Sequence, residues 1–442
     1  MTDQHTRFSD IAFEFFIRPE RMGEYLLVPL EVPENVESLA LAYDYPTHSH
    51  PTQSLAEGTF TARVRENTID LGLVAPDGRQ VGASGADKRE IFISATQATP
   101  GYGATDLVPG TWHILAGAYR VAPEGVLVRY QARFTYKQPR WLLGDAHTHT
   151  IGSDGKLTAQ ELAEHARANR LDWLVITDHN QFIREGALPR LPGLTVIPGV
   201  EWTHYQGHAN FLGLEKPYDA PFFTNSFEET RARFQSTWER GATIVINHPY
   251  DEGCPFLYDL DALPFHLLEV WNGPMRPSNL RAIGLWNELL KAGRHVPAIG
   301  GSDYHNDRLA QILAGPCVNV LADSDSQADI LAALRRGRSY MVFQPESARL
   351  EMRSGTAQLG DSTPWSPDSR LDIKLEGLLP GDVLKLITAE GTRELFTSPA
   401  TGAFEGSFKV EKPGFARVEL WQSFGGMLPL LPALVSNPIW FE

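Results

Sequence analysis

The chain has 442 residues, of which 42% are hydrophobic and 21% charged, and its formal net charge at pH 7 is −15. At roughly 150 residues for a typical domain, this length predicts two or three domains. The negative charge argues against non-specific binding to nucleic acid and to anionic membranes, which requires a basic surface. The two cysteines, Cys254 and Cys317, could pair but do not suggest a disulfide framework.

The first residues, MTDQHTRFSD, lack the basic and apolar segments of a signal peptide. No apolar run approaches the roughly 18 residues that a membrane helix needs. We therefore expect a cytoplasmic protein without a membrane partner. The sequence gives no indication of the oligomeric state.

Residues 1–138 show the pattern of a β-domain. Apolar and polar residues alternate in candidate strands such as EYLLVPLEV and GVLVRYQARFTY, and turn segments such as PDGRQ separate them. Short strands with such turns predict a β-sandwich-like N-terminal domain. His48 and His50 form a His-x-His pair here, but they precede Pro51 in a domain without other candidate ligands, and we interpret them as loop residues.

Over residues 139–345, short apolar runs alternate with helical segments. The runs are WLLGDAH, DWLVITDH, LTVIPGVEW, HANFLGL, ATIVINHP, LLEVWNG and VPAIGGSDYH. Capping-box patterns at Thr158–Glu161 and Ser226–Glu229 predict two helix starts, and Ser278 is the expected cap of a third helix. The alternation predicts an α/β fold with a parallel sheet, and about seven strands favour a distorted (β/α)7 barrel. No helix is evident between the third and fourth runs, so we expect the barrel to be irregular.

Residues 346–442 return to the β pattern, in segments such as LDIKLEG, DVLKLITA and FARVELWQS. They predict a second, smaller β-sandwich-like domain. The predicted architecture is therefore a barrel over residues 139–345 between two all-β domains, residues 1–138 and 346–442.

Potential metal ligands accompany the predicted barrel strands. Most lie at the carboxyl ends, where such barrels place their chemistry, and only His208 opens its strand. The candidates are His147, His149, Asp154, His179, Glu201, His208, His248, Asp303 and His305. Any one of these histidines could be an ordinary surface or core residue. Independent loops, however, have no reason to repeat an apolar strand followed by a histidine or a carboxylate.

These side chains are suited to divalent ions. Alternate residues of an extended segment point the same way, so His147 and His149 can reach one ion. Imidazole suits Zn, Fe and Mn ions, and a carboxylate such as that of Glu201 can bridge two ions. The candidates exceed the roughly three or four protein ligands that one ion uses, so we expect two or three divalent ions, Mn, Zn or Fe. Gly152 and Gly155 should let the loop around Asp154 turn tightly through positive φ.

The order of these motifs resembles that of the PHP domain, the polymerase and histidinol phosphatase superfamily. The motifs fall within residues 141–343 in this order: HTH followed by Asp154, then TDHN, PGVEW, GHANFLG, NHP and GSDYH. The resemblance implies a distorted (β/α)7 barrel that holds two or three metals and mostly hydrolyses phosphate esters. The flanking β-domains, EVWNG and the closing SNPIWF are similar to the branch that includes carbaryl hydrolase.

The resemblance also implies how the ligands divide. One ion would be held by His147, His149, Glu201 and Asp303, a second by Glu201, His208 and His248, and a third by Asp154, His179 and His305. Many family members have a histidine where Asp154 stands, which leaves the metal preference of the third site open.

We predict a metal-dependent hydrolase, in the first place a phosphoesterase that acts on a phosphomonoester or phosphodiester. In this enzyme, a water bridged between ions would attack a small anionic substrate. The predicted catalytic residues are Glu201, which would hold two ions, and Asp303 and His305, of which Asp303 or a nearby histidine would relay a proton. Lys156 and Arg276 are candidates for binding the anion, and His204 for touching the substrate, although surface basic residues are most often merely solvated.

Two alternatives stay open. One is hydrolysis of a carboxyl ester, carbamate or amide on the same metal centre, although no predicted strand ends in the lysine that amidohydrolases typically carry. The other is a non-catalytic ligand-binding protein with a degenerate barrel, against which the complete ligand set argues.

Overall fold

The computed structural model describes residues 7–48, 66–183, 186–307, 312–424 and 429–442. The chain divides into two compact units, Met1–Gln138 and Pro139–Glu442. None of the described helices is both long and apolar enough to cross a membrane.

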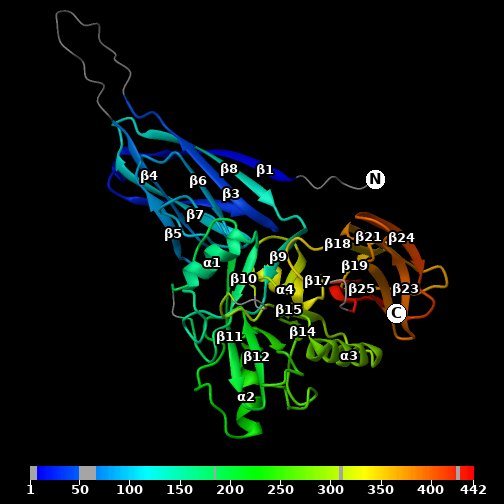
Figure 1. Ribbon diagram of the computed structural model, residues 1–442. Helices are drawn as coiled ribbons and strands as arrows, with labels where there is room; N and C mark the ends of the chain where they lie inside the picture. The colour runs from blue at the N-terminus through cyan, green and yellow to red at the C-terminus, as the bar shows by residue number, and fades with distance from the viewer. Residues whose placement is uncertain (1–6, 49–65, 184–185, 308–311, 425–428) are drawn as a thin grey trace, which may run out of the picture. The chain divides into compact units, whose positions relative to one another are not determined.

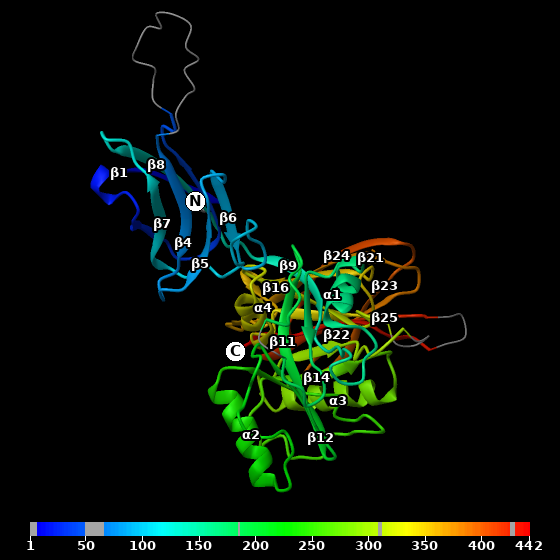
Figure 2. The same cartoon turned by 90° about the vertical axis from the view of Figure 1, so that its left-hand side faces the viewer.

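The N-terminal unit contains two antiparallel sheets of four strands each (Figures 1 and 2). One sheet has the order β1 (Phe8–Ile17), β8 (Val126–Tyr136), β3 (Val36–Asp44) and β6 (Glu90–Ser94), and the other β2 (Tyr25–Val32), β7 (Gly110–Arg120), β4 (Thr68–Val74) and β5 (Gln80–Ser84). Every second side chain of β2 is buried, because alternate residues of a strand share one face. Leu41, Trp112 and Val128 belong to a core that both sheets share. Of the two histidines predicted to lie in a loop, His48 follows β3 and forms a hydrogen bond with the side chain of Thr47. His50 lies outside the described residues.

A 15-stranded sheet is the framework of the second unit. Its first strands lie side by side in chain order: β9 (Arg140–Asp145), β10 (Trp173–Ile176), β11 (Thr195–His204), β12 (Gly207–Leu212), β13 (Thr243–Ile246), β14 (Leu267–Asn272) and β15 (Ala298–Gly301). β12 runs antiparallel to both neighbours, whereas the other pairs are parallel. The carboxyl ends of all strands but β12 therefore meet at one edge.

The mixed α/β class is confirmed, but a closed barrel is not shown. Between the segments that follow β9 and β15, the β-pairing of the described residues is limited to an isolated bridge from Thr148 to Tyr304. The free edge of β9, which closure would need, is instead paired along its length with the antiparallel strand β16 (Cys317–Ala322). The bridge nevertheless brings the two ends of the run together at the carboxyl edge.

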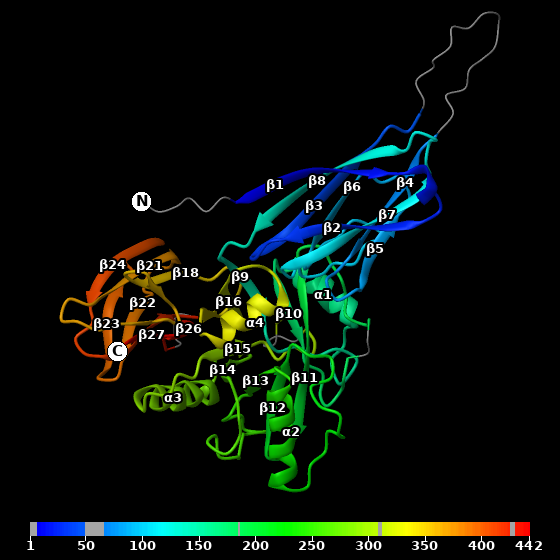
Figure 3. The ribbon, with the colours of Figure 1, turned by 180° about the vertical axis from the view of Figure 1, so that it is seen from behind.

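The described residues contain four α-helices: α1 (Ala159–Ala168), α2 (Phe227–Glu239), α3 (Pro277–Lys291) and α4 (Gln327–Arg335). They are fewer than a (β/α)7 barrel requires, because β11 and β12 are joined by a hairpin and the described residues between β10 and β11 form no helix. Figure 3 shows α3 lying along β14.

The helix starts follow the sequence in part. Thr158 forms the expected reciprocal capping box at α1. Ser226 caps α2, but the carboxylate of Glu229 accepts from the main chain of Asn225 and not from that of Ser226. Pro277 begins α3, where its missing N–H costs nothing, so Ser278 lies inside that helix and does not cap it.

The C-terminal strands continue the long sheet. Its order from β16 onward is β17 (Ser339–Val342), β26 (Leu431–Ser436), β25 (Gly414–Gln422), β22 (Val383–Thr388) and β23 (Gly391–Thr397), with β20 (Ser362–Thr363) and β27 (Ile439–Phe441) beside this path. A further sheet contains β19 (Ala357–Gln358), β18 (Arg349–Ser354), β21 (Arg370–Leu378) and β24 (Gly402–Lys409). Since β26 pairs with β17, residues 346–442 share a sheet with residues 139–345. The division into three domains stays a prediction.

Candidate metal centre

The predicted ligands converge at the carboxyl edge of the run from β9 to β15. Glu201 lies inside β11, and Thr203 of β11 pairs with His208 of β12. Because β12 runs in the opposite direction, its first residues lie at the edge where its neighbours end. This reversal explains why His208, which opens its strand, lies among ligands that follow theirs.

One group of side chains surrounds a single oxygen of Glu201. Oε2 of Glu201 lies 3.4 Å from His147 Nε2 and 3.5 Å from His149 Nε2. The same two nitrogens lie 3.4 and 3.0 Å from Oδ1 of Asp303. Both histidines and Glu201 are almost completely buried. Two nitrogens and two carboxylate oxygens thus face a common point.

The other oxygen of Glu201 faces a second group. Oε1 lies 3.1 Å from His208 Nδ1 and 3.3 Å from His248 Nε2. The side-chain amide of Asn247 donates to the same oxygen at 2.8 Å. This bond holds the carboxylate in the orientation that turns one oxygen towards each group.

A third group lies closer to solvent. Asp154 Oδ1 is 3.2 Å from His305 Nε2 and 3.7 Å from His179 Nε2. The ring of His149 stacks on both histidines, with centroid separations of 4.1 and 4.4 Å. His179 also connects this group to Glu201, since its Nδ1 lies 2.8 Å from Oε2. The side chain of Asp154 is 58% exposed, so this group marks the open side of the cluster.

The hydrogen bonds around the cluster leave lone pairs of some ligand atoms free to bind cations. Glu269 Oε1 lies 2.9 Å from His147 Nδ1, and since an ionised carboxylate only accepts, Nδ1 carries the proton. His147 Nε2 then turns a lone pair towards Glu201 Oε2, 3.4 Å away, and no hydrogen bond joins these two buried atoms. A divalent ion between them would satisfy both, and the mixed nitrogen and oxygen donors fit such ions.

The pKa shifts of the clustered carboxylates and histidines also indicate a site that favours positive charge. Burial lowers the pKa of His147, but neighbouring carboxylates, Asp303 first, raise it well above its usual value. Burial raises the pKa of Glu201, yet the surrounding histidines, His147 first, hold it well below its usual range. Asp303 is held low by the same balance, whereas burial lowers the pKa of His149. The carboxylates therefore stay ionised, as metal ligands must be.

The loop after His149 is held by Asp178, which accepts hydrogen bonds from the main chain and the hydroxyl of Thr150 at 2.7 and 2.6 Å. Gly152 and Gly155 do not have the positive φ expected of them. They are needed for space instead. An added Cβ would lie 2.6 Å from Asp178 at Gly152 and 2.4 Å from the carbonyl oxygen of His149 at Gly155.

Positive φ occurs at two of the candidate ligands themselves, His248 at 25° and Asp303 at 51°. This region is costly for residues with a Cβ and is concentrated at functional sites. Gly301 precedes the second of these turns, and a Cβ there would lie 2.4 Å from that of His147. Its glycine therefore lets β15 approach the segment that carries His147.

Several polar residues of the site were not predicted from the sequence. They are Asn247, Cys254, Glu269 and Asn272, which contact the candidate ligands. Glu269 carried a signal, because it is a charged residue inside the apolar run LLEVWNG and a buried carboxylate needs partners. The others depend on which strands are neighbours, and the sequence pattern does not show this.

The predicted substrate residues have different surroundings. His204 faces away from the cluster, because Glu201 and His204 are on opposite faces of β11, and its ring nitrogens bond to Thr224 and Tyr258. Arg276 pairs with Asp251 at 2.9 Å and donates to Asn272. Lys156 is exposed, and its main-chain N–H donates to His305 O at 2.9 Å. Of the three, only Lys156 stands beside the ligands without a described side-chain partner.

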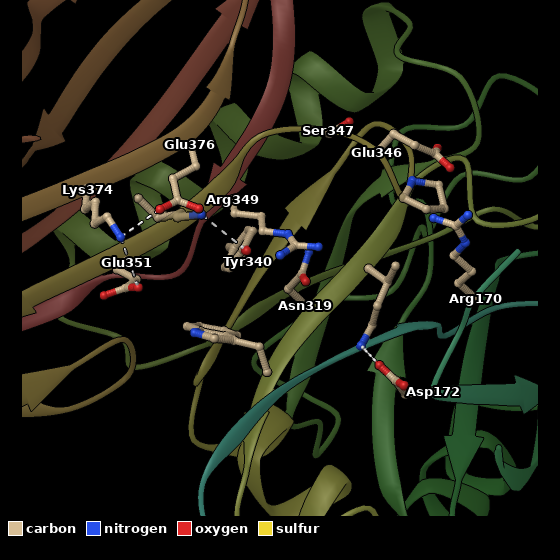
Figure 4. Close-up of a pocket in the computed structure, with 14 residues that line it drawn as sticks. Arg170, Asp172, Asn319, Tyr340, Glu346, Ser347, Arg349, Glu351, Lys374 and Glu376 are labelled. Atoms are coloured by element: carbon tan, nitrogen blue, oxygen red, sulfur yellow. Dashed lines mark hydrogen bonds and ion pairs between the residues drawn. The ribbon is translucent and has the colours of Figure 1, made fainter. Parts of the chain in front are cut away.

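A cavity of about 450 Å³ lies elsewhere in the second unit (Figure 4). Trp141 and Asp172, at the amino ends of β9 and β10, help to line it, together with Arg349 and Lys374. Lys374 forms an ion pair with Glu376 at 2.7 Å. Because it adjoins the amino ends of these strands, this cavity is distinct from the candidate metal centre.

No family model and no curated protein matches the chain. Among solved structures, it is similar to a two-domain protein from Bacteroides vulgatus that contains a predicted PHP-like metal-dependent phosphoesterase, with 17% identity over 64% of this chain and 90% of that one, at a TM-score of 0.39. A candidate metal-dependent phosphoesterase from Bifidobacterium adolescentis matches with 17% identity over 43% and 96%, at a TM-score of 0.30. An amidohydrolase from Chromobacterium violaceum matches with 16% identity over 38% and 89%, at a TM-score of 0.29. At these identities and TM-scores, the likeness assigns no activity to this chain.

Proposed function

We propose that the chain is a metal-dependent hydrolase of the PHP type that cleaves a phosphate ester of a small molecule with two or three divalent ions, Mn, Zn or Fe. The observation that supports this most is that the two carboxylate oxygens of Glu201 face different groups of histidines. Oε2 faces His147 and His149, whereas Oε1 faces His208 and His248. Only a carboxylate can offer a separate oxygen to each of two ions in this way.

The residues that would hold the ions follow from the distances. One ion would lie among His147, His149, Glu201 and Asp303, a second among Glu201, His208 and His248, and a third among Asp154, His179 and His305. When bound, such ions lower the pKa of water and neutralise charge that develops on the ester.

The protein's own groups can move a proton at the open side of the cluster. His305 Nδ1 donates to the main-chain oxygen of Asp303 at 2.8 Å, which fixes the ring and turns its Nε2 towards Asp154 and solvent. Oδ1 of Asp303 lies 3.7 Å from His305 Nδ1. Asp303 and His305 remain our candidates for accepting a proton or passing one to a leaving group, His305 only while its Nε2 is not bound to an ion.

One observation favours a second candidate, a neutral carboxyl ester or carbamate. Besides the proposed ions, side-chain cations often bind the oxygens of a phosphate ester, yet Arg276 is already paired with Asp251, and Lys156 is the remaining predicted side-chain cation. The resemblance to the carbaryl hydrolase branch agrees with a neutral ester.

A substrate panel tests both candidates. The protein, purified and then loaded with Mn, Zn or Fe, is assayed with 4-nitrophenyl phosphate, bis(4-nitrophenyl) phosphate, 4-nitrophenyl acetate and an aryl carbamate. Phosphoesterase activity that is lost on chelation and in Glu201→Gln supports the first candidate. Turnover of the acetate or carbamate alone supports the second, and metal-loaded protein without any turnover contradicts both.

A further inference from the structure

We infer that Cys254 is a positioning residue for His248 and that it sets how tightly the ion held by Glu201, His208 and His248 binds. The inference rests on the proposed metal centre and adds to it a residue outside the predicted ligands. Cys254 lies in the segment after β13, six residues beyond His248, and is half-buried.

The two nitrogens of the His248 ring have different partners. Nε2 lies 3.3 Å from Glu201 Oε1, on the side of the proposed ion. Nδ1 lies 3.8 Å from the sulfur of Cys254, within hydrogen-bond range for sulfur. Because the nitrogens point to different sides of an imidazole, the sulfur contacts the nitrogen that faces away from the ion. His248 Nδ1–H can thus donate to Cys254 while Nε2 keeps its lone pair for the metal.

His147 has the same arrangement, but its outer partner is a carboxylate oxygen in place of sulfur. His147 turns Nε2 towards Glu201 and gives Nδ1–H to the carboxylate of Glu269. An outer partner of this kind fixes the tautomer and the ring orientation of a metal-binding histidine. Cys254 occupies the equivalent position for His248, with sulfur in place of a carboxylate oxygen.

The thiol is itself held in place. The main-chain N–H of Cys254 donates to Asp251 Oδ1 at 3.3 Å, and its sulfur lies 3.5 Å from the same oxygen. Asp251 Oδ2 pairs with Arg276 at 2.9 Å. The main-chain N–H of Asp251 donates back to His248 O at 2.9 Å. Through this ion pair Arg276 helps to hold Asp251, and with it the thiol that supports His248.

Two variants separate the role of the sulfur from that of the fold. Cys254→Ala removes the acceptor, whereas Cys254→Ser keeps a smaller one. Metal affinity is measured by competition of Zn²⁺ with a chromogenic chelator, and metal content by elemental analysis. We expect Cys254→Ala to weaken one ion about 10- to 100-fold and to leave the others as in the wild type, with Cys254→Ser between the two. The metal-free variants should melt as the wild type does.

The chain offers a matched control, since its other cysteine, Cys317, is fully buried on β16. Cys317→Ala should leave every ion affinity unchanged. In the native protein an alkylating reagent reports on Cys254, and its reaction should slow when metal fixes His248.

Three results would overturn the inference. The first is a Cys254→Ala protein that binds all ions as tightly as the wild type. The second is a sulfur-to-metal charge-transfer band in the Co²⁺-loaded wild type that is lost in Cys254→Ala, because the sulfur would then be a direct ligand. The third is a wild-type protein that binds no metal, which would also remove the proposed function. The first two leave that function standing.

Discussion

Glu269→Gln changes a residue that supports the cluster and leaves every proposed ligand unmutated. The carboxylate is 2% exposed and accepts three hydrogen bonds. Oε1 accepts from His147 Nδ1 at 2.9 Å, and Oε2 from His248 N at 2.9 Å and Asn272 Nδ2 at 3.2 Å. A glutamine has one acceptor oxygen and one NH₂ donor. In either orientation, its NH₂ group meets a donor.

The cost can be estimated from these contacts. If the oxygen turns to His248 and Asn272, His147 loses the partner that fixes its tautomer, which typically weakens a metal about 10- to 100-fold. This corresponds to roughly 1.4–2.8 kcal/mol at about 1.4 kcal/mol for each tenfold change. If the oxygen turns to His147 instead, the unpaired main-chain donor of His248 costs about 1–3 kcal/mol of stability. Either way, the ions around Glu201 should be affected more than the ion near Asp154.

The assay is metal affinity by chelator competition, together with thermal unfolding of the metal-free protein. Glu288→Gln is the matched control. Glu288 lies on α3 with its side chain 69% exposed, and it pairs with Lys291 of the same helix and not with a residue of the cluster. Affinity and stability that are both the same in Glu269→Gln as in Glu288→Gln would refute the reasoning.

Three further predictions concern other parts of the chain. Asp154→Asn should remove one ion and leave the ions at Glu201 in place, as counted by elemental analysis; an unchanged metal count would make Asp154 only a loop residue. Arg417→Met should cost about 3–5 kcal/mol in denaturant unfolding, because Arg417 is fully buried 2.7 Å from Glu419 and its loss leaves that carboxylate buried without its cation; a smaller loss than for an exposed arginine would contradict this. Burial lowers the pKa of His266 from 6.5 to about 4, so the unfolded chain binds that proton more readily, and stability present above pH 6.5 is lost as the pH falls towards 4. Solvent screening of this partly exposed ring limits the loss to roughly 1–2 kcal/mol, and a His266→Gln protein with an equally steep acid dependence between these pH values would disprove it.

The sequence predicted the strand ends better than the connections between strands. Apolar runs marked β10, β13 and β15 because both faces of these strands are buried, and they also marked β9, one face of which is only partly buried. The pattern could not show that β16 pairs with β9, because pairing depends on residues far apart in the chain. The sequence therefore could not show whether the run of strands closes, and the distorted barrel stays a prediction.

The candidate site shows the same limit. His-x-His spacing and strand-end carboxylates point to chemistry through residue type alone, and the structure brings all of the predicted ligands into one cluster. The direction of β12 was needed to place His208, and strand alternation beyond Glu201 was needed to see that His204 faces away. Glu269 is 122 residues from its partner His147 in the chain, and Cys254, six residues after His248, belongs to no motif, so their contacts with these histidines emerge only from the fold.

The most direct test of the proposed centre is a metal count in the wild type and in Glu201→Gln. Both proteins are purified without chelators, reconstituted with Mn, Zn or Fe, and measured by plasma emission. If Glu201 bridges two ions, the wild type holds two or three ions per chain, and Glu201→Gln, still folded, loses the two ions on either side of residue 201. One ion or less in the reconstituted wild type, or an unchanged count in Glu201→Gln, would contradict the bridged centre.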